Sequence, residues 1–113
     1  MEVISKSLSN YDVITIVGRI DSYSAPSISN MLDSLIQKGH HNIVVDMQDV
    51  SYLSSSGILV FLETHRQLLR RGQGRLILTN LSSNIYSILE VAGLETVFNF
   101  CDDLQSAEGR FQI

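Results

Sequence analysis

A nearly continuous apolar run, reading His-Asn-Ile-Val-Val-Asp-Met, occupies residues 41–47. A strand that is covered on both faces has this pattern, because neither set of its alternating side chains reaches water. A second run of this kind, Arg-Leu-Ile-Leu-Thr, occupies residues 75–79, and a helical pattern lies between the two. Parallel strands joined by a right-handed helical crossover account for this order, so the chain is predicted to have an α/β fold.

The N-terminal part of the chain indicates an antiparallel hairpin. Residues from about 3 to 7 alternate in character, and residues 13–17 are rich in β-branched side chains. The polar residues 10–12 between these runs supply turn chemistry. Residues 18–21, Gly-Arg-Ile-Asp, are expected to lead away from the sheet.

Three stretches carry apolar side chains three and four residues apart, which is typical of helices buried along one side. The first begins near residue 24 and ends at Gly39, and the second runs to about Arg71 and ends at Gly72. The third begins at residues 82–83 and ends at Gly93. Serine at the start of such a stretch and glycine after it are favoured helix caps.

The C-terminal part is predicted to add one short strand at residues 97–100 and a helical turn or two capped by residues 102–103. The element order is therefore β-β-α-β-α-β-α-β-α. It predicts one α/β domain over residues 1–113, with a mixed sheet of four to five strands and about four helices.

Charge and composition argue against several classes of partner. The net charge of −4 argues against nucleic acid and anionic membranes, which attract basic surfaces. Cys101 is the single cysteine, so an intrachain disulfide is impossible and a reducing compartment is favoured. The chain shows no signal peptide and no apolar run near the roughly 20 residues that span a bilayer. A cytoplasmic protein is expected, as a monomer or a weak dimer.

A cluster of serines stands at the start of the second helix, where residues 53–62 read LSSSGILVFL. One serine is enough to cap a helix, so three of them do not follow from capping. Gly57 costs about 1 kcal/mol inside a helix relative to alanine. Its presence therefore predicts a close approach by another group.

The helical period divides the side chains of this helix between two faces. With Ile58 taken as the inward reference, the core-facing stripe comprises Phe61, Leu62, His65, Leu68 and Leu69. The outward side then carries Leu59, Val60, Glu63, Thr64, Arg66, Gln67 and Arg70. Two exposed aliphatic residues beside a hydroxyl cluster indicate a place for a protein partner.

A phosphate on Ser55 would suit this position, since the free N–H groups and the dipole of a helix N-terminus favour anions. It would add close to two negative charges beside Leu59 and Val60. A partner that buries these side chains would be repelled. Phosphorylation would then change binding without refolding the domain.

Enzymatic function finds little support in the sequence. A serine nucleophile needs a base within reach, but His65 lies roughly 15 Å along the helix from Ser55. The adjacent His40 and His41 would point in opposite directions, which is poor geometry for a metal. Asp46 and Asp49 are interpreted as loop caps, with cation binding as the alternative. We therefore predict no catalytic residues, no metal site and no cofactor.

The element order together with the segment Val44–Val60 resembles the STAS domain, in its anti-sigma factor antagonist branch. Residues 18–21 are similar to the G-x-hydrophobic-D turn of that family, and the resemblance covers essentially the whole chain. The resemblance implies phosphorylation of Ser55, with Ser54 and Ser56 as alternatives. It also implies a docking face for the partner at Asp21, Ser54, Ser56, Gly57, Leu59, Val60 and Glu63.

The resemblance further implies an anti-sigma factor that is also a serine kinase, and a PP2C-type phosphatase that removes the phosphate. Only the unphosphorylated form would bind the anti-sigma factor. Ser54 stands where the family usually has aspartate, so it can cap the helix without bringing a charge.

Two other functions remain open on the sequence. One is a STAS scaffold or regulatory subunit that works without phosphorylation, in a stressosome-like assembly or a transport ATPase. The other is a sensor of nucleotides or small anions at the helix N-terminus.

Overall fold

A computed structural model describes residues 1–111 of the chain. Five strands form one sheet in the order of the sequence: β1 (Glu2–Ser7), β2 (Asp12–Ile20), β3 (Asn42–Leu53), β4 (Arg75–Thr79) and β5 (Asn99–Cys101). β1 is antiparallel to β2, and all later neighbours are parallel. The predicted mixed sheet and N-terminal hairpin are confirmed. Residues 112–113 of the predicted domain lie outside the described part.

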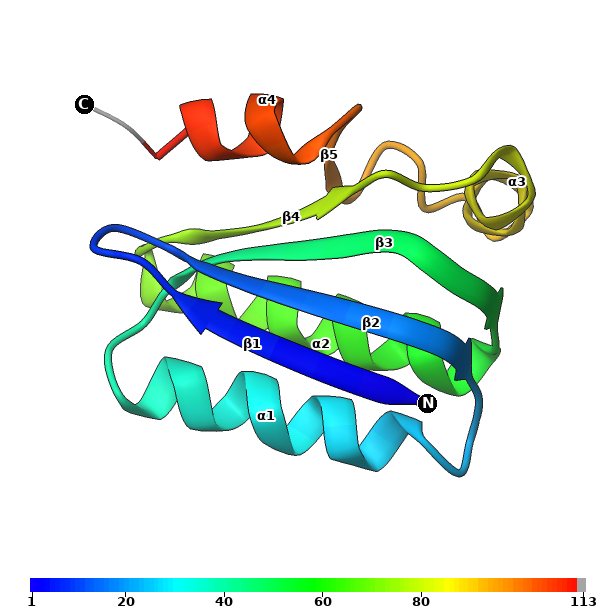
Figure 1. The fold of residues 1–113 in the computed structure, drawn as a ribbon, viewed down its shortest axis with the longest axis horizontal. Coiled ribbons are helices and arrows are strands. Elements are labelled where there is room, and N and C mark those ends of the chain that lie inside the picture. Colours follow the sequence, from blue (N-terminus) through cyan, green and yellow to red (C-terminus); the bar gives the residue numbers. More distant parts are fainter. Residues whose placement is uncertain (112–113) are drawn as a thin grey trace.

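The described residues also form four helices: α1 (Ala25–Gln37), α2 (Ser55–Arg71), α3 (Ser83–Val91) and α4 (Leu104–Gly109). α1 and α2 lie side by side beneath the sheet, whereas α4 crosses its opposite face (Figure 1). Gly72 takes a left-handed conformation at φ 66° and ends α2 as predicted. The Asp103 carboxylate caps α4 by accepting a hydrogen bond from the Ser106 N–H at 2.8 Å.

The core is divided by the sheet, and β3 contributes to both sides. Ile43, Val45 and Met47 pack against α1 and α2, while Val44 packs beneath α4 in a second cluster. This double coverage explains the nearly continuous apolar run at the start of β3. The buried side of α3, through Ile85, belongs to the larger cluster.

Two strands are longer than the hydrophobic runs predict. Residues 18–20 stay in β2 instead of leaving the sheet, and they pair with the end of β3. Asp46 was expected to close a strand as a loop cap, but it lies inside β3 and pairs with Thr15. Two register shifts, one between Thr15 and Val17 and one between Gly18 and Arg19, accommodate the extra residues of β3 after Asp46. The strand therefore continues to Leu53, where α2 begins.

The last strand is shifted relative to the prediction. β5 covers residues 99–101, whereas the sequence indicated 97–100. Val97 instead belongs to a turn, because its N–H donates to the Leu94 carbonyl at 3.1 Å.

The buried face of α2 centres on a different residue from the one expected. Gly57, Phe61, Thr64 and Leu68 are buried, at helical spacings of four, three and four. Thr64 therefore faces the core, contrary to its predicted outward position, and Leu69 is 67% exposed, contrary to its predicted inward position. The small Gly57 brings this line of residues, and not the line through Ile58, nearest to the sheet.

Candidate functional site

The serine cluster lies at the junction between the end of β3 and the start of α2. The Ser54 side-chain oxygen accepts a hydrogen bond from the Gly57 N–H at 3.2 Å and caps the helix. The Ser54 N–H donates to the Ile20 carbonyl at 2.8 Å, which ties the cluster to the end of β2. Ser54 is half-buried, and its hydroxyl is engaged in the cap.

Ser55 is the first residue of α2, and its side chain is exposed. The first helical hydrogen bond runs from the Ile58 N–H to the Ser54 carbonyl at 3.0 Å. The N–H groups of Ser55 and Ser56 precede that bond, so they are available to an anion at the helix start. Ser56 is half-buried. Ser55 is therefore the most accessible hydroxyl of the three.

Gly57 allows α2 to start close to the sheet. A Cβ atom at this position would lie 2.6 Å from Ile20 Cγ2 and 2.8 Å from Leu53 Cδ1. The predicted close approach is therefore confirmed, and the approaching groups belong to the domain itself. Gly57 itself is buried, so the exposed surface at the start of α2 is formed by its neighbours.

The two aliphatic residues that were expected to face outward differ in exposure. Leu59 is 54% exposed, as predicted. Val60 is half-buried and packs against the core, so its expected outward position is only partly correct. Glu63 is exposed and pairs with Arg66 at 3.6 Å, an arrangement that contributes little to stability at such exposure.

Asp21 organises the turn between β2 and α1. Its Oδ1 atom accepts hydrogen bonds from the N–H groups of Tyr23, at 3.1 Å, and Ser24, at 3.0 Å. The bond from the Ser24 N–H is the largest cause that holds the pKa of Asp21 below its ordinary value. Asp21 follows Ile20, whose carbonyl binds Ser54, so this turn lies beside the serine cluster.

Tyr23 is a further candidate that the sequence did not indicate. It lies in the turn held by Asp21, and its side chain is 93% exposed. Aromatic residues are enriched at protein interfaces because they bury a large area at low entropic cost. A single tyrosine among polar turn residues carries no periodic signal, so only the structure reveals its exposure.

His65 is buried and packs edge-on against Phe98, with ring centroids 5.8 Å apart. Burial lowers the pKa of His65, as expected for a base whose charged form loses hydration. Its predicted place in the core-facing stripe of this helix is confirmed.

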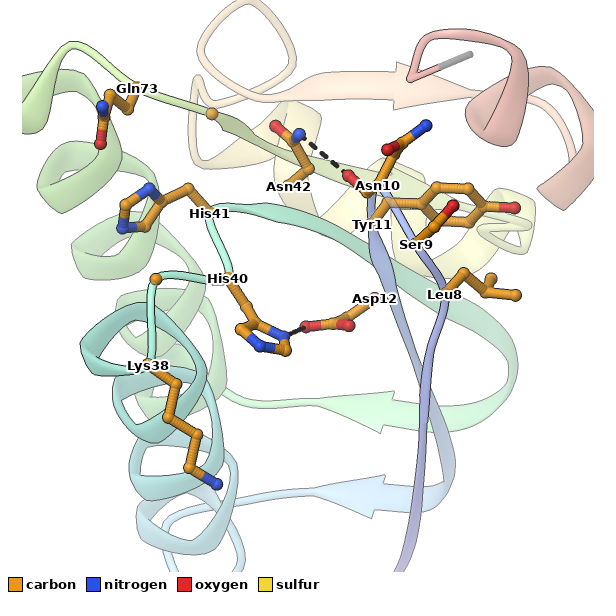
Figure 2. A pocket seen from close by; sticks show the side chains of 12 residues that line it. Leu8, Ser9, Asn10, Tyr11, Asp12, Lys38, His40, His41, Asn42 and Gln73 are labelled. Atoms are coloured by element: carbon orange, nitrogen blue, oxygen red, sulfur yellow. Dashed lines mark hydrogen bonds and ion pairs between the residues drawn. The ribbon is translucent and has the colours of Figure 1, made fainter.

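A polar hollow of about 550 Å³ lies at the opposite end of β3 from the serine cluster (Figure 2). Its main internal contact joins His40 Nδ1 to Asp12 Oδ2 at 2.7 Å. The His40 ring turns toward Asp12, whereas the His41 ring points away from it. Within residues 1–111, no group of three or more histidine, cysteine or acidic side chains could hold a metal ion.

Asp46 makes two hydrogen bonds to protein groups. Its Oδ1 atom accepts from the Gln48 N–H at 3.1 Å and from Asn80 Nδ2 at 3.0 Å. It thus links β3 to the residue that follows β4.

None of the described helices is both long and apolar enough to cross a membrane.

The mixed sheet and the serine-capped helix at the end of β3 define the class of protein. The chain belongs to the STAS domain family, whose model matches residues 5–107. It is 34% identical over 86 residues to the anti-sigma-B factor antagonist of Bacillus subtilis, covering 76% of this chain and 77% of that protein. It is 28% identical over 109 residues to the anti-sigma-B factor antagonist of Listeria monocytogenes, covering 96% of this chain and 90% of the relative.

Solved structures share the same fold. The anti-sigma factor antagonist SpoIIAA in its unphosphorylated form superposes with a TM-score of 0.77 and 20% identity, covering 96% of each chain. The phosphorylated form of the Bacillus cell fate determinant SpoIIAA gives a TM-score of 0.77 at 20% identity, covering 98% of this chain and 100% of that one. These structures match the whole domain described above.

Proposed function

We propose that this chain is an anti-sigma factor antagonist, and that phosphorylation of Ser55 switches off its binding to an anti-sigma factor. The observation that carries the proposal is the exposed hydroxyl of Ser55 at the first position of α2, one turn before the exposed Leu59. The curated relatives from Bacillus subtilis and Listeria monocytogenes are both named as anti-sigma-B factor antagonists, which supports the proposal.

The position of Ser55 suits reversible phosphorylation. The free N–H groups of Ser55 and Ser56 and the positive end of the helix dipole would stabilise the added phosphate. The Ser54 cap does not involve the Ser55 hydroxyl, so modification leaves the helix start in place. The domain would therefore keep its fold while the charge of this surface changes by nearly two units.

The docking surface in this proposal consists of the exposed turn at Tyr23 and the exposed first turns of α2. Tyr23 and Leu59 supply apolar contact area, because both are large apolar side chains that are more than half exposed. The polar rim comprises Asp21, Ser54, Ser56 and Glu63, with Val60 contributing through its exposed part. A partner that buries Leu59 would have to desolvate a phosphate on Ser55, which opposes binding.

Ser54 keeps the local geometry although the family usually has aspartate there. Its oxygen makes the cap bond to Gly57 that an aspartate carboxylate would make. Ser54 and Ser56 remain alternative acceptors, but both are half-buried. We therefore assign the modification to Ser55.

The proposed partners are an anti-sigma factor that acts as the serine kinase and a PP2C-type phosphatase that reverses the reaction. The chain itself would act as a binding regulator in the cytoplasm and not as an enzyme. The anti-sigma factor would bind the surface around unmodified Ser55. Phosphorylation of Ser55 by its kinase activity would then dissociate the complex.

The modification is tested by incubating the protein with the host's candidate anti-sigma kinases and ATP, followed by mass mapping of the peptides. We expect one phosphate on Ser55 and none after Ser55→Ala. Phosphate on Ser54 or Ser56 alone would refute the assignment to Ser55. No phosphate anywhere in residues 54–56 would refute the switch.

The electrostatic effect is tested by measuring the affinity for the same anti-sigma factor by calorimetry. Ser55→Asp should weaken binding by tenfold or more, and Ser55→Ala should leave it nearly unchanged. Ser83→Asp is the matched control, because Ser83 is an exposed first residue of α3 after the Ser82 cap. It places the same charge on another helix start, so binding should persist.

Equal affinities for Ser55→Asp, Ser83→Asp and the unmodified protein would contradict the proposed switch. Co-purification with a large assembly, together with no effect of Ser55 substitutions, would support the STAS scaffold instead.

A further inference from the structure

β1 is an edge strand of the sheet. β2 is the only strand paired with β1 among the described residues, so the other side of β1 is unpaired (Figure 1). An exposed strand edge offers a row of N–H and C=O groups to another strand. At the far edge of the sheet, β5 has only three residues, whereas β1 has six.

The side chains of β1 alternate between the core and solvent. Val3 packs against the core formed with α1 and α2, so Glu2, Ile4 and Lys6 share the opposite face of the strand. Ile4 is 52% exposed, and both charged residues are exposed. An apolar side chain thus lies midway between an acidic and a basic one.

This pattern is self-complementary in one antiparallel register. When two copies of β1 pair about a twofold axis at Ile4, Ile4 faces Ile4 of the second copy. Glu2 of each copy then faces Lys6 of the other, which creates two opposite-charge pairs. Directly opposed charges of this kind stabilise antiparallel strands, and like charges destabilise them.

We propose that β1 pairs with β1 of a second copy of this chain, in the antiparallel register centred on Ile4. The pairing joins two sheets into one continuous sheet across the dimer axis. It is a closed arrangement, because each copy contributes the same edge and that edge is then occupied. A lysine often protects an edge strand from pairing, but here Glu2 of the second copy neutralises Lys6.

The dimer is expected to be weak. A six-residue strand contributes a short backbone ladder and few side chains, less than the roughly 1,000 Å² that a stable interface buries. We expect a dissociation constant on the order of 100 µM. The inference is independent of the proposed function, since it does not involve Ser55.

Sedimentation velocity over a concentration series from about 10 µM to 1 mM tests the pairing around this expected dissociation constant. The unmodified protein should shift from monomer to dimer. Lys6→Glu places Glu2 opposite another glutamate at both ends of the ladder and should weaken dimerisation by roughly tenfold. The double variant Glu2→Lys, Lys6→Glu restores both opposite-charge pairs and should dimerise like the unmodified protein.

Arg70→Glu is the matched control, because Arg70 is exposed on α2 and the substitution changes the net charge by the same amount. It should leave dimerisation unchanged. Circular dichroism of each variant checks that the fold is retained. In proton–nitrogen NMR spectra of the unmodified protein, dilution should shift the amide signals of residues 2–7 most.

A protein that stays monomeric at the highest concentration would overturn the inference. Equal weakening by Lys6→Glu and Arg70→Glu, or failure of the double variant to recover, would also overturn it.

Discussion

Gly57 allows a direct test of how α2 is seated on the sheet. Gly57→Ala adds a methyl group that would lie 2.6 Å from Ile20 Cγ2. That atom is attached directly to the Ile20 β-carbon, so it cannot move away without rotating a stiff β-branched side chain. The second neighbour, Leu53 Cδ1 at 2.8 Å, is the end of a flexible side chain and can shift more easily.

Two opposing effects set the size of the change. Overpacking of a filled core costs about 1–3 kcal/mol, whereas replacing a helical glycine by alanine gains about 1 kcal/mol. We expect the free energy of unfolding to fall by up to about 2 kcal/mol. For a domain of this size, the melting temperature should drop by up to about 10 °C.

Urea unfolding followed by far-UV circular dichroism measures this change, with an unchanged denaturant slope as evidence that only stability differs. Gly109→Ala is the matched control, because it also replaces a helical glycine but meets nothing within 4 Å. It should be neutral or slightly stabilising. If Gly57→Ala is as stable as Gly109→Ala, the close approach of α2 to Ile20 does not explain this glycine.

Two further predictions concern the same end of the domain. Ser54→Ala removes the cap bond to Gly57 and should lower the free energy of unfolding by about 0.5–2 kcal/mol, whereas Ser54→Asp should preserve stability. Urea unfolding measures both variants, and an equal loss of stability in the two would contradict the role of Ser54 as a cap. Asp21 has a lowered pKa, so the stability that it contributes is full above its ordinary pKa of 3.8 and is lost as the pH falls through the lower folded value. Asp21→Asn should therefore flatten the decline of stability in acid, and an unchanged pH profile would contradict the turn bonds.

Much of the fold could be predicted from local patterns. The buried runs at residues 43–45 and 76–78 specify strands, because strands covered on both faces need apolar side chains at every position. Ser82 marks the start of α3 and Gly72 marks the end of α2. Both ends could be predicted because a cap depends on one residue, through its side chain for serine and through its backbone conformation for glycine. The LSSSG stretch indicated a helix start with a hydroxyl at its tip, and Ser55 lies there exposed.

The remaining features depend on contacts between distant residues. β3 continues beyond Asp46 because β2 lies beside it and register shifts accommodate the polar residues, which no local pattern reveals.

The buried side of α2 shows the same limit. The helical period predicts a buried stripe along α2, but only the approach of Ile20 to Gly57 decides on which residues that stripe is centred. That approach buries Thr64 and Val60 more deeply than periodicity suggested and leaves Leu69 in solvent. The exposure of Tyr23 likewise follows from the turn that Asp21 holds.

By itself, the sequence determined which segments are strands and helices, where the helices are capped and that a cluster of hydroxyls stands at the start of α2. Those properties depend on residues within a turn or two of each other. The tertiary structure alone decided which faces are buried, how far β2 and β3 extend, and which edge of the sheet is unpaired. These depend on how separate elements approach one another, and that approach is set by the packing of the whole domain.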